Sequence, residues 1–309
     1  MVKIAIAGSG GLAWIFAKAL CSTEHTTIIL SRNDQPEFAK LECQVVVLDY
    51  DSQLDLRFHL RGIDVVISTV SGAPQINLID AAHDAGVTRF VPAEFEGPPA
   101  RRALNDPLNR GKRETIARLK DWSHDTRNPM RFTIFSCGVF YQRFARGGLA
   151  LYNIGIGTGI ERQGAYLMNL GNDTAEVVEY TGDGKPIYIC LTDVYDLANF
   201  IVAALDHGLS SWLPEFRVQS DRKTVTEILH YGAVVKNVNG LDTITHEAQN
   251  LKKNIDYASY QQDWDTVARF EELAATESGR YNFTQPNLNP LVNVVPTPFW
   301  DWLYHEWKS

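Results

Sequence analysis

Short apolar runs alternate with helical apolar patterns over the first 141 residues. The runs lie at 2–7, 26–30, 44–48, 64–69, 89–91 and 131–136. Each ends in polar or glycine-rich residues, and most of the segments between them repeat apolar residues at helical spacing. Runs of this kind predict buried strands, and strands that alternate with helices predict a parallel, doubly wound α/β sheet of the Rossmann type.

The pattern changes after about residue 141. Residues 147–171 are rich in glycine and aromatic residues and lack helical periodicity. Strands are predicted at 186–191 and 216–219, and helices at 194–205, 225–235 and 257–275. We therefore predict a Rossmann domain over residues 1–141 and a smaller C-terminal α+β domain over 142–309. The segment at about 186–205 is expected to pack back onto the Rossmann sheet.

The first strand runs directly into a glycine-rich turn. Residues 2–7 read V-K-I-A-I-A, and Gly8-Ser9-Gly10-Gly11-Leu12 follows before a helical pattern that extends through Leu20. Strand, glycine turn and helix in this order open a dinucleotide-binding βαβ unit, in which helix N–H groups face the pyrophosphate. The alternative is a strand–helix turn that binds no ligand.

The second predicted strand ends in Ser31 and Arg32, with no carboxylate before Asp34. This strand tip lies near the adenosine ribose in dinucleotide-binding folds, where an acidic residue selects NAD. An arginine there can instead form a bidentate pair with a 2′-phosphate, so NADP is favoured. Lys40 could add a second positive charge, and the alternative for Arg32 is a solvated loop residue.

Composition limits the partners of the 309-residue chain. A net charge of −8 and a pI near 5.5 argue against nucleic acid or an anionic membrane as a partner, and no apolar run is long enough to span a bilayer. We expect a cytoplasmic protein with a small-molecule substrate. The four cysteines, Cys21, Cys43, Cys137 and Cys190, have no CxxC spacing and are predicted to be reduced thiols, mostly buried. The histidines show no metal-binding spacing, so no metal is expected.

Several segments resemble one known family. They are the glycine turn, the strand ending in Ser31-Arg32, G-I-D-V-V-I-S at 62–68, A-A-H-D-A-G-V-T-R-F-V-P-A-E-F at 81–95, G-V-F at 138–140, G-D-G-K-P at 182–186 and T-D-V-Y-D-L-A at 192–198. Together they resemble the NmrA-like and isoflavone-reductase-like family, an atypical branch of the short-chain dehydrogenases/reductases, and look most like its fungal members. The resemblance covers about residues 1–205.

The resemblance implies an NADPH-binding Rossmann domain capped by a substrate-binding domain. The cofactor contacts that it implies are Gly8, Ser9, Gly10, Gly11, Leu12, Ser31, Arg32, Thr69, Val70, Ser71, Pro92, Ala93 and Glu94. The family's catalytic lysine, on the helix after the fifth strand, corresponds to Lys112. Candidate substrate contacts follow the sixth strand at Cys137, Phe140 and Tyr141, although Cys137 has no recognisable histidine partner and is also expected to be buried.

Two departures from the family pattern concern Trp14 and Ile116. Trp14 stands where the family has a third glycine, and its ring could push the helix from the strand or crowd the pyrophosphate. Ala13 could supply the small residue instead. Ile116 lies four residues after Lys112 where three is usual, which leaves the helix register open. Arg110 and Arg113 are alternative cations, and both are expected near Lys112, where they would favour proton release.

Three functions fit these residues. The first is an NADPH-dependent reductase of a small aromatic or polyketide-like metabolite, with Lys112 as proton donor. The second is an NAD(P)-sensing regulatory protein without catalysis, and the third is a redox-neutral isomerase, cyclase or dehydratase on the same scaffold. The Tyr-x-x-x-Lys pair at Tyr304 and Lys308 is read as a coincidence. The substrate and a homodimeric state are left open.

Overall fold

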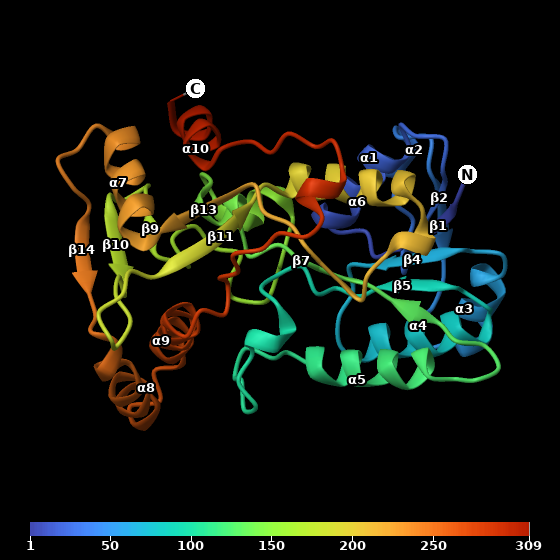
Figure 1. The fold of residues 1–309 in the computed structure, drawn as a ribbon, viewed down its shortest axis with the longest axis horizontal. Helices are drawn as coiled ribbons and strands as arrows, with labels where there is room; N and C mark the ends of the chain where they lie inside the picture. Colours follow the sequence, from blue (N-terminus) through green and yellow to red (C-terminus); the bar gives the residue numbers. More distant parts are fainter. Residues whose placement is uncertain (309) are drawn as a thin grey trace.

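The computed structural model describes residues 1–308, and its centre is a six-stranded parallel sheet (Figure 1). The strand order is β3-β2-β1-β4-β5-β6, and every neighbouring pair is parallel. The strands are β1 Lys3–Ala7, β2 Thr26–Ser31, β3 Gln44–Val47, β4 Val65–Ser68, β5 Arg89–Val91 and β6 Arg131–Phe132. The order reverses between β1 and β4, and ligands bind at the carboxyl ends of strands at such a point. The predicted Rossmann-type fold is confirmed.

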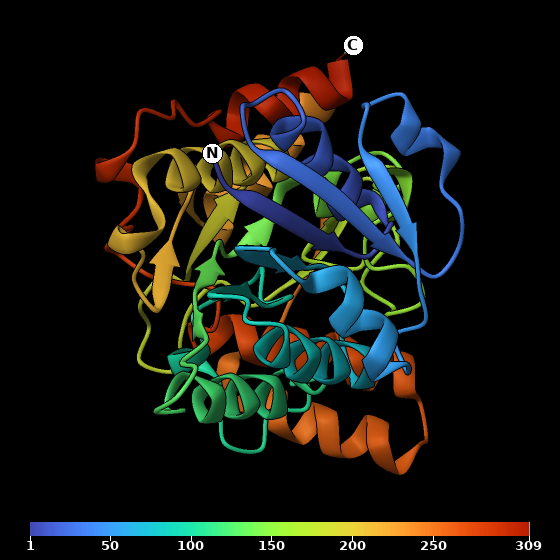
Figure 2. The same cartoon turned by 90° about the vertical axis from the view of Figure 1, so that its right-hand side faces the viewer.

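Strand β1 shows how the sequence places helices on both faces of this sheet. Successive residues of a strand face opposite sides. Ile4 and Ile6 pack in one apolar cluster with residues of α1 and α6, whereas Ala5 and Ala7 pack in another with residues of α3, α4 and α5. Figure 2 shows these two layers above and below the sheet. The helices are α1 Gly11–Leu20, α2 Pro36–Ala39, α3 Gln53–Leu60, α4 Ala73–Asp84, α5 Lys112–Ser123 and α6 Val194–His207.

The C-terminal part is built from small sheets and four further helices, at the left in Figure 1. Strands β13-β11-β8 form one sheet, β14-β10-β9 another, and β7 pairs with β12. The strands are β7 Ile134–Ser136, β8 Val139–Phe140, β9 Met168–Asn169, β10 Thr174–Val177, β11 Tyr188–Thr192, β12 Glu215–Arg217, β13 Asp221–Thr224 and β14 Asp242–Thr245. The helices are α7 Val225–Lys236, α8 Leu251–Tyr260, α9 Trp264–Glu277 and α10 Phe299–Lys308. Short 3-10 turns are η1 Pro99–Arg101, η2 Tyr141–Phe144, η3 Gly148–Tyr152, η4 Leu209–Ser211, η5 Ala248–Asn250 and η6 Asn289–Leu291.

Helix α6 lies against α1, although it follows residue 141 by more than fifty residues. Its apolar side chains Leu197 and Ile201 belong to the same cluster as Ile4 and Phe16. A second cluster joins η2, β11 and α10 and gives the C-terminal part a core of its own. The domain limits at 141 and 142 stay a prediction.

The cysteines correct the sequence analysis. Cys21, directly after α1, and Cys43, directly before β3, form a disulfide with their Cα atoms 6.5 Å apart, so these two are not the reduced thiols that we predicted. Strand β2, between them, returns the chain past the end of α1, and this tertiary placement leaves no signature in the spacing. Cys137 and Cys190 are free and buried.

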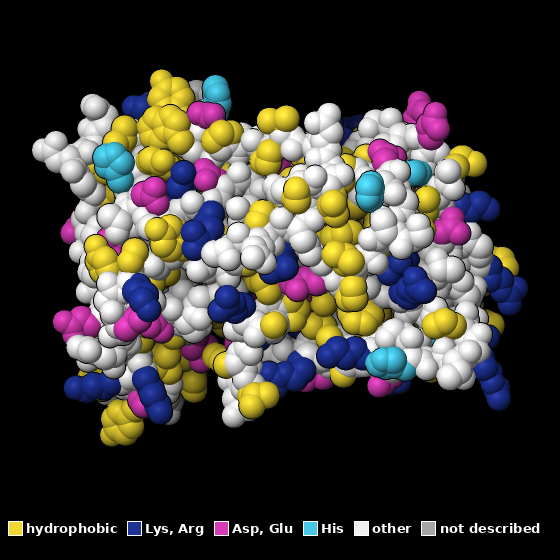
Figure 3. Space-filling model, in the orientation of Figure 1, with side chains coloured by type: hydrophobic (Ala, Val, Ile, Leu, Met, Phe, Trp, Pro, Cys, Tyr) yellow, Lys and Arg dark blue, Asp and Glu magenta, His cyan; other side chains and the backbone are white. Residues whose placement is uncertain are grey.

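Neither a membrane span nor a metal cluster is found in residues 1–308. No helix there combines the length and apolar character needed to cross a bilayer, and no group of three or more His, Cys, Asp and Glu side chains could hold an ion. The face in Figure 3 carries Lys and Arg side chains interspersed with Asp and Glu. This face therefore offers no continuous basic surface.

Candidate functional site

The turn after β1 requires glycine at its first position. Gly8 has a φ of +108°, and a Cβ built there would lie 2.3 Å from Oγ1 of Thr69. The Gly8 N–H donates to the Leu30 carbonyl (2.9 Å), and the Thr69 hydroxyl donates to the Ala7 carbonyl (2.8 Å). The turn is therefore tied to both neighbouring strands, β2 and β4.

The start of α1 shows how the chain accommodates Trp14. Ala13 is completely buried in the core beneath the helix, whereas Trp14 is only partly buried. Trp14 borders a cavity of about 270 Å³ with Phe38, Tyr152 and Tyr195. This cavity adjoins the larger one described next and shares Ser9, Gly10, Gly11 and Asn153 with it. The small residue that packs inside the fold is thus Ala13, which gives the spacing Gly8, Gly10, Ala13, and the ring of Trp14 does not separate α1 from the sheet.

A cavity of about 490 Å³ opens at the carboxyl edge of β1, β2 and β4. Its lining includes three groups of residues predicted for the cofactor, namely Gly8–Leu12, Ser31 with Arg32, and Thr69–Ser71. Ser31 and Ser9 are joined by a hydrogen bond of 3.2 Å across the cavity wall. Sequence reasoning missed the remaining lining residues, which are Tyr50, Pro74 and five residues between 153 and 158.

Arg32 is the cation of this cavity. Its side chain is exposed, and it forms no ion pair within residues 1–308. Its neighbour Tyr50 donates its hydroxyl to the Leu30 carbonyl, and burial raises the pKa of Tyr50 although Arg32 acts to lower it. The guanidinium is therefore free to pair with a phosphate of a dinucleotide, and the narrow glycine turn fits the pyrophosphate.

The segment after β5 lies apart from the lining of this cavity. The Ala93 N–H donates to the Gln75 side chain (2.8 Å), which fixes the turn that follows Pro92. Glu94 is fully buried and forms an ion pair with Arg102. Burial raises the pKa of Glu94, although the nearby cations oppose this. Pro92, Ala93 and Glu94 do not line this cavity, and their contact with the cofactor stays a prediction.

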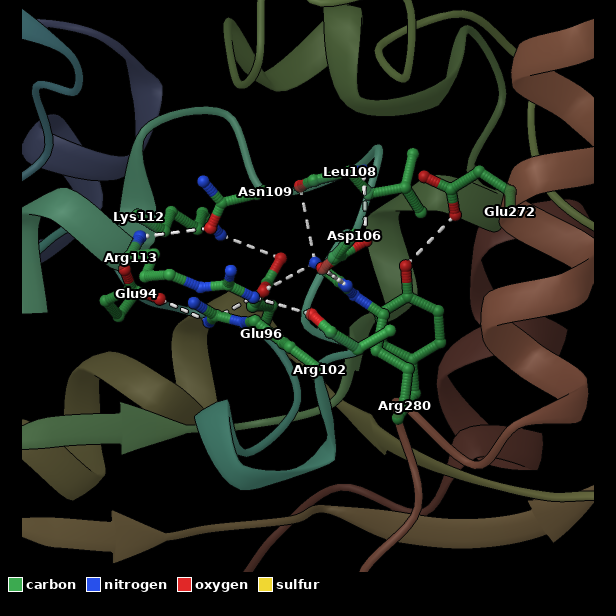
Figure 4. A network of polar contacts seen from close by, with 12 residues as sticks. Glu94, Glu96, Arg102, Asp106, Leu108, Asn109, Lys112, Arg113, Glu272 and Arg280 are labelled. Atoms are coloured by element: carbon green, nitrogen blue, oxygen red, sulfur yellow. Dashed lines mark hydrogen bonds and ion pairs between the residues drawn. The ribbon is translucent and has the colours of Figure 1, made fainter.

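Lys112, the first residue of α5, forms an ion pair with Glu96 (Figure 4). Nζ lies 2.7 Å from Oε2 of Glu96, and Arg102 and Arg280 approach the other oxygen at 2.7 and 3.0 Å. Burial acts to raise the pKa of Glu96, but these three cations outweigh it and lower the pKa to about 2. Arg110 and Arg113 were expected beside Lys112, whereas the direct partner of Lys112 is the Glu96 carboxylate.

The other two expected cations lie elsewhere. Arg113 is exposed and donates to the Ala103 carbonyl (2.6 Å), and Arg110 is exposed before α5. Ile116 is only partly buried, whereas the α5 residues that face inward are Thr115 and Leu119. Lys112 is thus the only one of these three cations that joins the buried network.

Arg280 ties the loop before α5 to the C-terminal part. It is 2% exposed and binds Glu96, the Asp106 carboxylate and the Leu108 carbonyl. From α9, Glu272 accepts from Arg143 and from the Tyr281 hydroxyl. Sequence reasoning missed Glu96, Arg102 and Arg280. The one available signal was the second acidic residue of the E-F-E triplet that follows β5.

The predicted substrate contacts are mostly in the core. Cys137 is fully buried, which raises the pKa of its thiol, and it borders none of the cavities described above. Tyr141 is also fully buried, donates its hydroxyl to Thr297 and packs against the rings of Phe299 and Trp302. These two predictions are corrected by packing, and only Phe140 is partly accessible. Tyr304 and Lys308 lie on the C-terminal helix α10.

Comparisons with known proteins agree with this geometry. Residues 8–131 match the family described as NAD(P)H-binding. The oxidoreductase BOA1 of Botryotinia fuckeliana (strain B05.10) is 26% identical over 251 residues, which cover 74% of this chain and 74% of that protein. Residues 8–131 are thus similar to NAD(P)H-binding domains, and 74% of the chain is similar to a fungal oxidoreductase.

Solved structures similar to this chain share its fold along nearly its whole length. Leucoanthocyanidin reductase of Vitis vinifera, in a binary complex with NADPH, has a TM-score of 0.72 at 17% identity, covering 99% of this chain and 100% of that one. An isoflavone reductase has a TM-score of 0.71 at 16% identity, covering 98% of each chain. At these identities the two likenesses show that the chain has the fold of these reductases, and the family match of residues 8–131 indicates an NAD(P)H-binding domain.

Proposed function

We propose that this protein is an oxidoreductase that transfers hydride from NADPH to a small aromatic or polyketide-like metabolite. One observation carries the proposal: a single cavity joins the glycine turn, the unpaired Arg32 and Thr69–Ser71 at the carboxyl edge of the sheet. The names of the two reductases similar in structure refer to aromatic substrates, and the fungal relative is named an oxidoreductase. These names support the substrate class.

Different residues of the chain have different roles in the proposed reduction. When bound, NADPH supplies the hydride. The glycine turn and the start of α1 hold the pyrophosphate, and Arg32 pairs with the 2′-phosphate. Lys112 donates a proton to the substrate from Nζ, and Glu96 holds the Lys112 side chain in position until the substrate arrives.

Titration of the protein with NADPH and NADH tests the cofactor role of Arg32. We expect Arg32→Ala to weaken NADPH binding about 10- to 150-fold, because one charge-assisted contact is worth about 1.5–3 kcal/mol. NADH, which lacks the 2′-phosphate, is expected to bind both proteins equally. Arg61→Ala, which changes another exposed arginine, should leave both affinities unchanged. Equal weakening of NADPH and NADH by Arg32→Ala would contradict the assignment.

The ion pair of Lys112 favours one second candidate, the NAD(P)-sensing protein without catalysis. The ammonium is engaged by Glu96, and its side chain is only 16% exposed. An assay of NADPH oxidation with a panel of aromatic carbonyl and unsaturated compounds separates the two functions. The reductase predicts turnover that falls by about 10²-fold or more in Lys112→Met, whereas the sensor predicts NADPH binding with no turnover in either protein. Turnover without NADPH would instead indicate a redox-neutral enzyme.

A further inference from the structure

Residues 153–158, which we call the strap, lie across the start of α1. The Gly11 N–H donates to the Asn153 carbonyl (2.8 Å), and a Cβ built on Gly11 would lie 1.6 Å from the Tyr152 carbonyl oxygen. At Gly10 the nearest atom is the Asn153 oxygen at 3.4 Å, an ordinary contact distance. Glycine at position 11 therefore serves to admit the strap, a requirement that the nucleotide motif alone does not explain.

The strap also forms a wall of the cofactor cavity. Asn153, Ile154, Gly155, Ile156 and Thr158 line the same cavity as the glycine turn. Ile154 is 8% exposed and anchors the strap in the core that contains α1 and α6, whereas the side chain of Ile156 is 58% exposed. One end of the strap is therefore fixed, and an apolar side chain further along borders the cavity without being covered.

Glu161 organises the strap without lining the cavity. Its carboxylate accepts the Gly157 N–H (3.3 Å), and its carbonyl accepts the Ala150 N–H (2.9 Å). The backbone N–H groups of Glu161 itself, Gly157 and Gly159 lower the pKa of this carboxyl. Gly155, Gly157 and Gly159 all have positive φ, a conformation in which a carboxylate can tie several backbone N–H groups together.

We propose that the strap is a second cofactor-binding segment that closes on the dinucleotide beside the glycine turn. Strap atoms contact the pyrophosphate and its adjoining ribose, and Ile156 is covered by the bound molecule. The proposal rests on the proposed function, because it requires that NADPH bind in this cavity. It goes beyond that function by assigning part of the affinity to residues outside the Rossmann unit.

The opposite role for the strap is a gate. Because the Asn153 carbonyl uses the Gly11 N–H, a gate would exclude phosphate until it opened, and loosening it would strengthen cofactor binding. If the strap is instead a clamp, meaning a segment that binds the cofactor as proposed here, loosening it weakens cofactor binding. Contacts are then lost from the bound state, and the entropy of ordering the strap is added to the cost of binding. The sign of one affinity change therefore separates the two.

The experiment compares Glu161→Ala with Glu161→Gln. Alanine removes the acceptor of the Gly157 N–H, whereas glutamine keeps an oxygen there. We expect Glu161→Ala to weaken NADPH binding about five- to tenfold, as for the loss of one or two hydrogen bonds, and Glu161→Gln to weaken it less. Ile156→Ala, at an exposed position, should weaken NADPH binding several-fold with an unchanged melting temperature.

Trypsin supplies a readout that is independent of affinity. Arg162, the exposed residue after Glu161, is a cleavage site. We expect NADPH to slow cleavage there in the wild type, and cleavage without NADPH to be faster in Glu161→Ala. If the wild type binds no NADPH, the proposed function itself fails. If it binds NADPH but both Glu161→Ala and Ile156→Ala bind equally well or better, the clamp is wrong while the proposed function stands.

Discussion

The cofactor cavity is shaped mainly by backbone, whereas the network around Lys112 is held by charged side chains. At the cavity, Gly8 and Gly11 admit neighbouring atoms that no side chain would allow. At the network, Glu96 gathers Lys112, Arg102 and Arg280 from three separate segments. The first region depends on glycines that allow close backbone contacts, and the second on charges that pair when the C-terminal part docks. We therefore expect different substitutions and conditions to disrupt the cavity and the network.

The largest effect is expected from removing the centre of the network. Glu96→Ala leaves three cations without their shared carboxylate, and breaking a buried ion pair from one side costs about 3–5 kcal/mol. We expect the free energy of unfolding, measured in urea, to fall by about this amount. The control is Glu24→Ala, at an exposed position, which should change it by less than about 0.5 kcal/mol. A loss of similar size in both variants would remove Glu96 from the centre of the network.

A smaller loss of stability is expected at the glycine turn. Gly8→Ala adds a Cβ 2.3 Å from the Thr69 hydroxyl at a φ of +108°, so both strain and collision apply. We expect a loss of about 2–4 kcal/mol and no measurable NADPH binding. Gly62→Ala shares the positive φ (+76°) but meets nothing within 4 Å, and it should cost about 1 kcal/mol. An equal loss of unfolding free energy in Gly8→Ala and Gly62→Ala would show that the close contact between Gly8 and Thr69 is unimportant.

Acid should weaken the network more than the cavity. The pKa of Glu96 is about 2 in the folded protein against an ordinary value of 4.5, so its contribution to stability is present above about pH 4.5 and is lost as the pH falls towards 2. Glu94 and Asp193, whose pKa values are raised by burial, act in the opposite direction. Glu96→Gln removes the pH-dependent contribution of Glu96 and leaves those of Glu94 and Asp193.

We therefore expect the wild type to lose about 2 kcal/mol more than Glu96→Gln when the pH falls from about 6 to about 3. Urea unfolding at a series of pH values measures the difference. Parallel curves for the two proteins would contradict the low pKa of Glu96. The Gly8→Ala variant should follow the wild-type curve, displaced by a constant amount.

The smallest effect is expected at Trp14. Its ring borders the neighbouring cavity and not the one assigned to the cofactor. We expect Trp14→Phe to change the NADPH dissociation constant by less than about twofold, within the scatter of a substitution that keeps apolar contact. A tenfold change in the dissociation constant would show that the Trp14 ring belongs to the cofactor site.

The sequence predicts what is encoded locally. The run V-K-I-A-I-A and the glycines after it specify strand, turn and helix, because the periodicity and the glycine conformations are properties of adjacent residues. The helix predicted at 257–275 is instead two helices, α8 and α9. Strand β14 was missed because all four of its residues are exposed, so it carries no alternation of apolar and polar positions.

The rest of the site depends on contacts between distant segments. Arg280 lies 184 positions after the carboxylate that it binds, and Asn153 lies more than a hundred after Gly11. The same limit explains the wrong assignment of Cys137 and Tyr141 to the substrate. A residue at a strand end can face either the cleft or the core, and only the packing of α10 shows that Tyr141 faces the core.

The Cys21–Cys43 bond makes a closed ring of the chain segment that carries Arg32. The ring contains β2 and α2, and it fastens the sheet edge at β3 to the far end of the helix whose start borders the cofactor cavity. Closing a loop of this length removes about 3 kcal/mol of chain entropy from the unfolded state. The ring therefore limits how far local opening of β3 can move Arg32 from the cavity. Reduction would remove this limit, so NADPH affinities measured with and without a thiol reductant refer to two chemically different proteins.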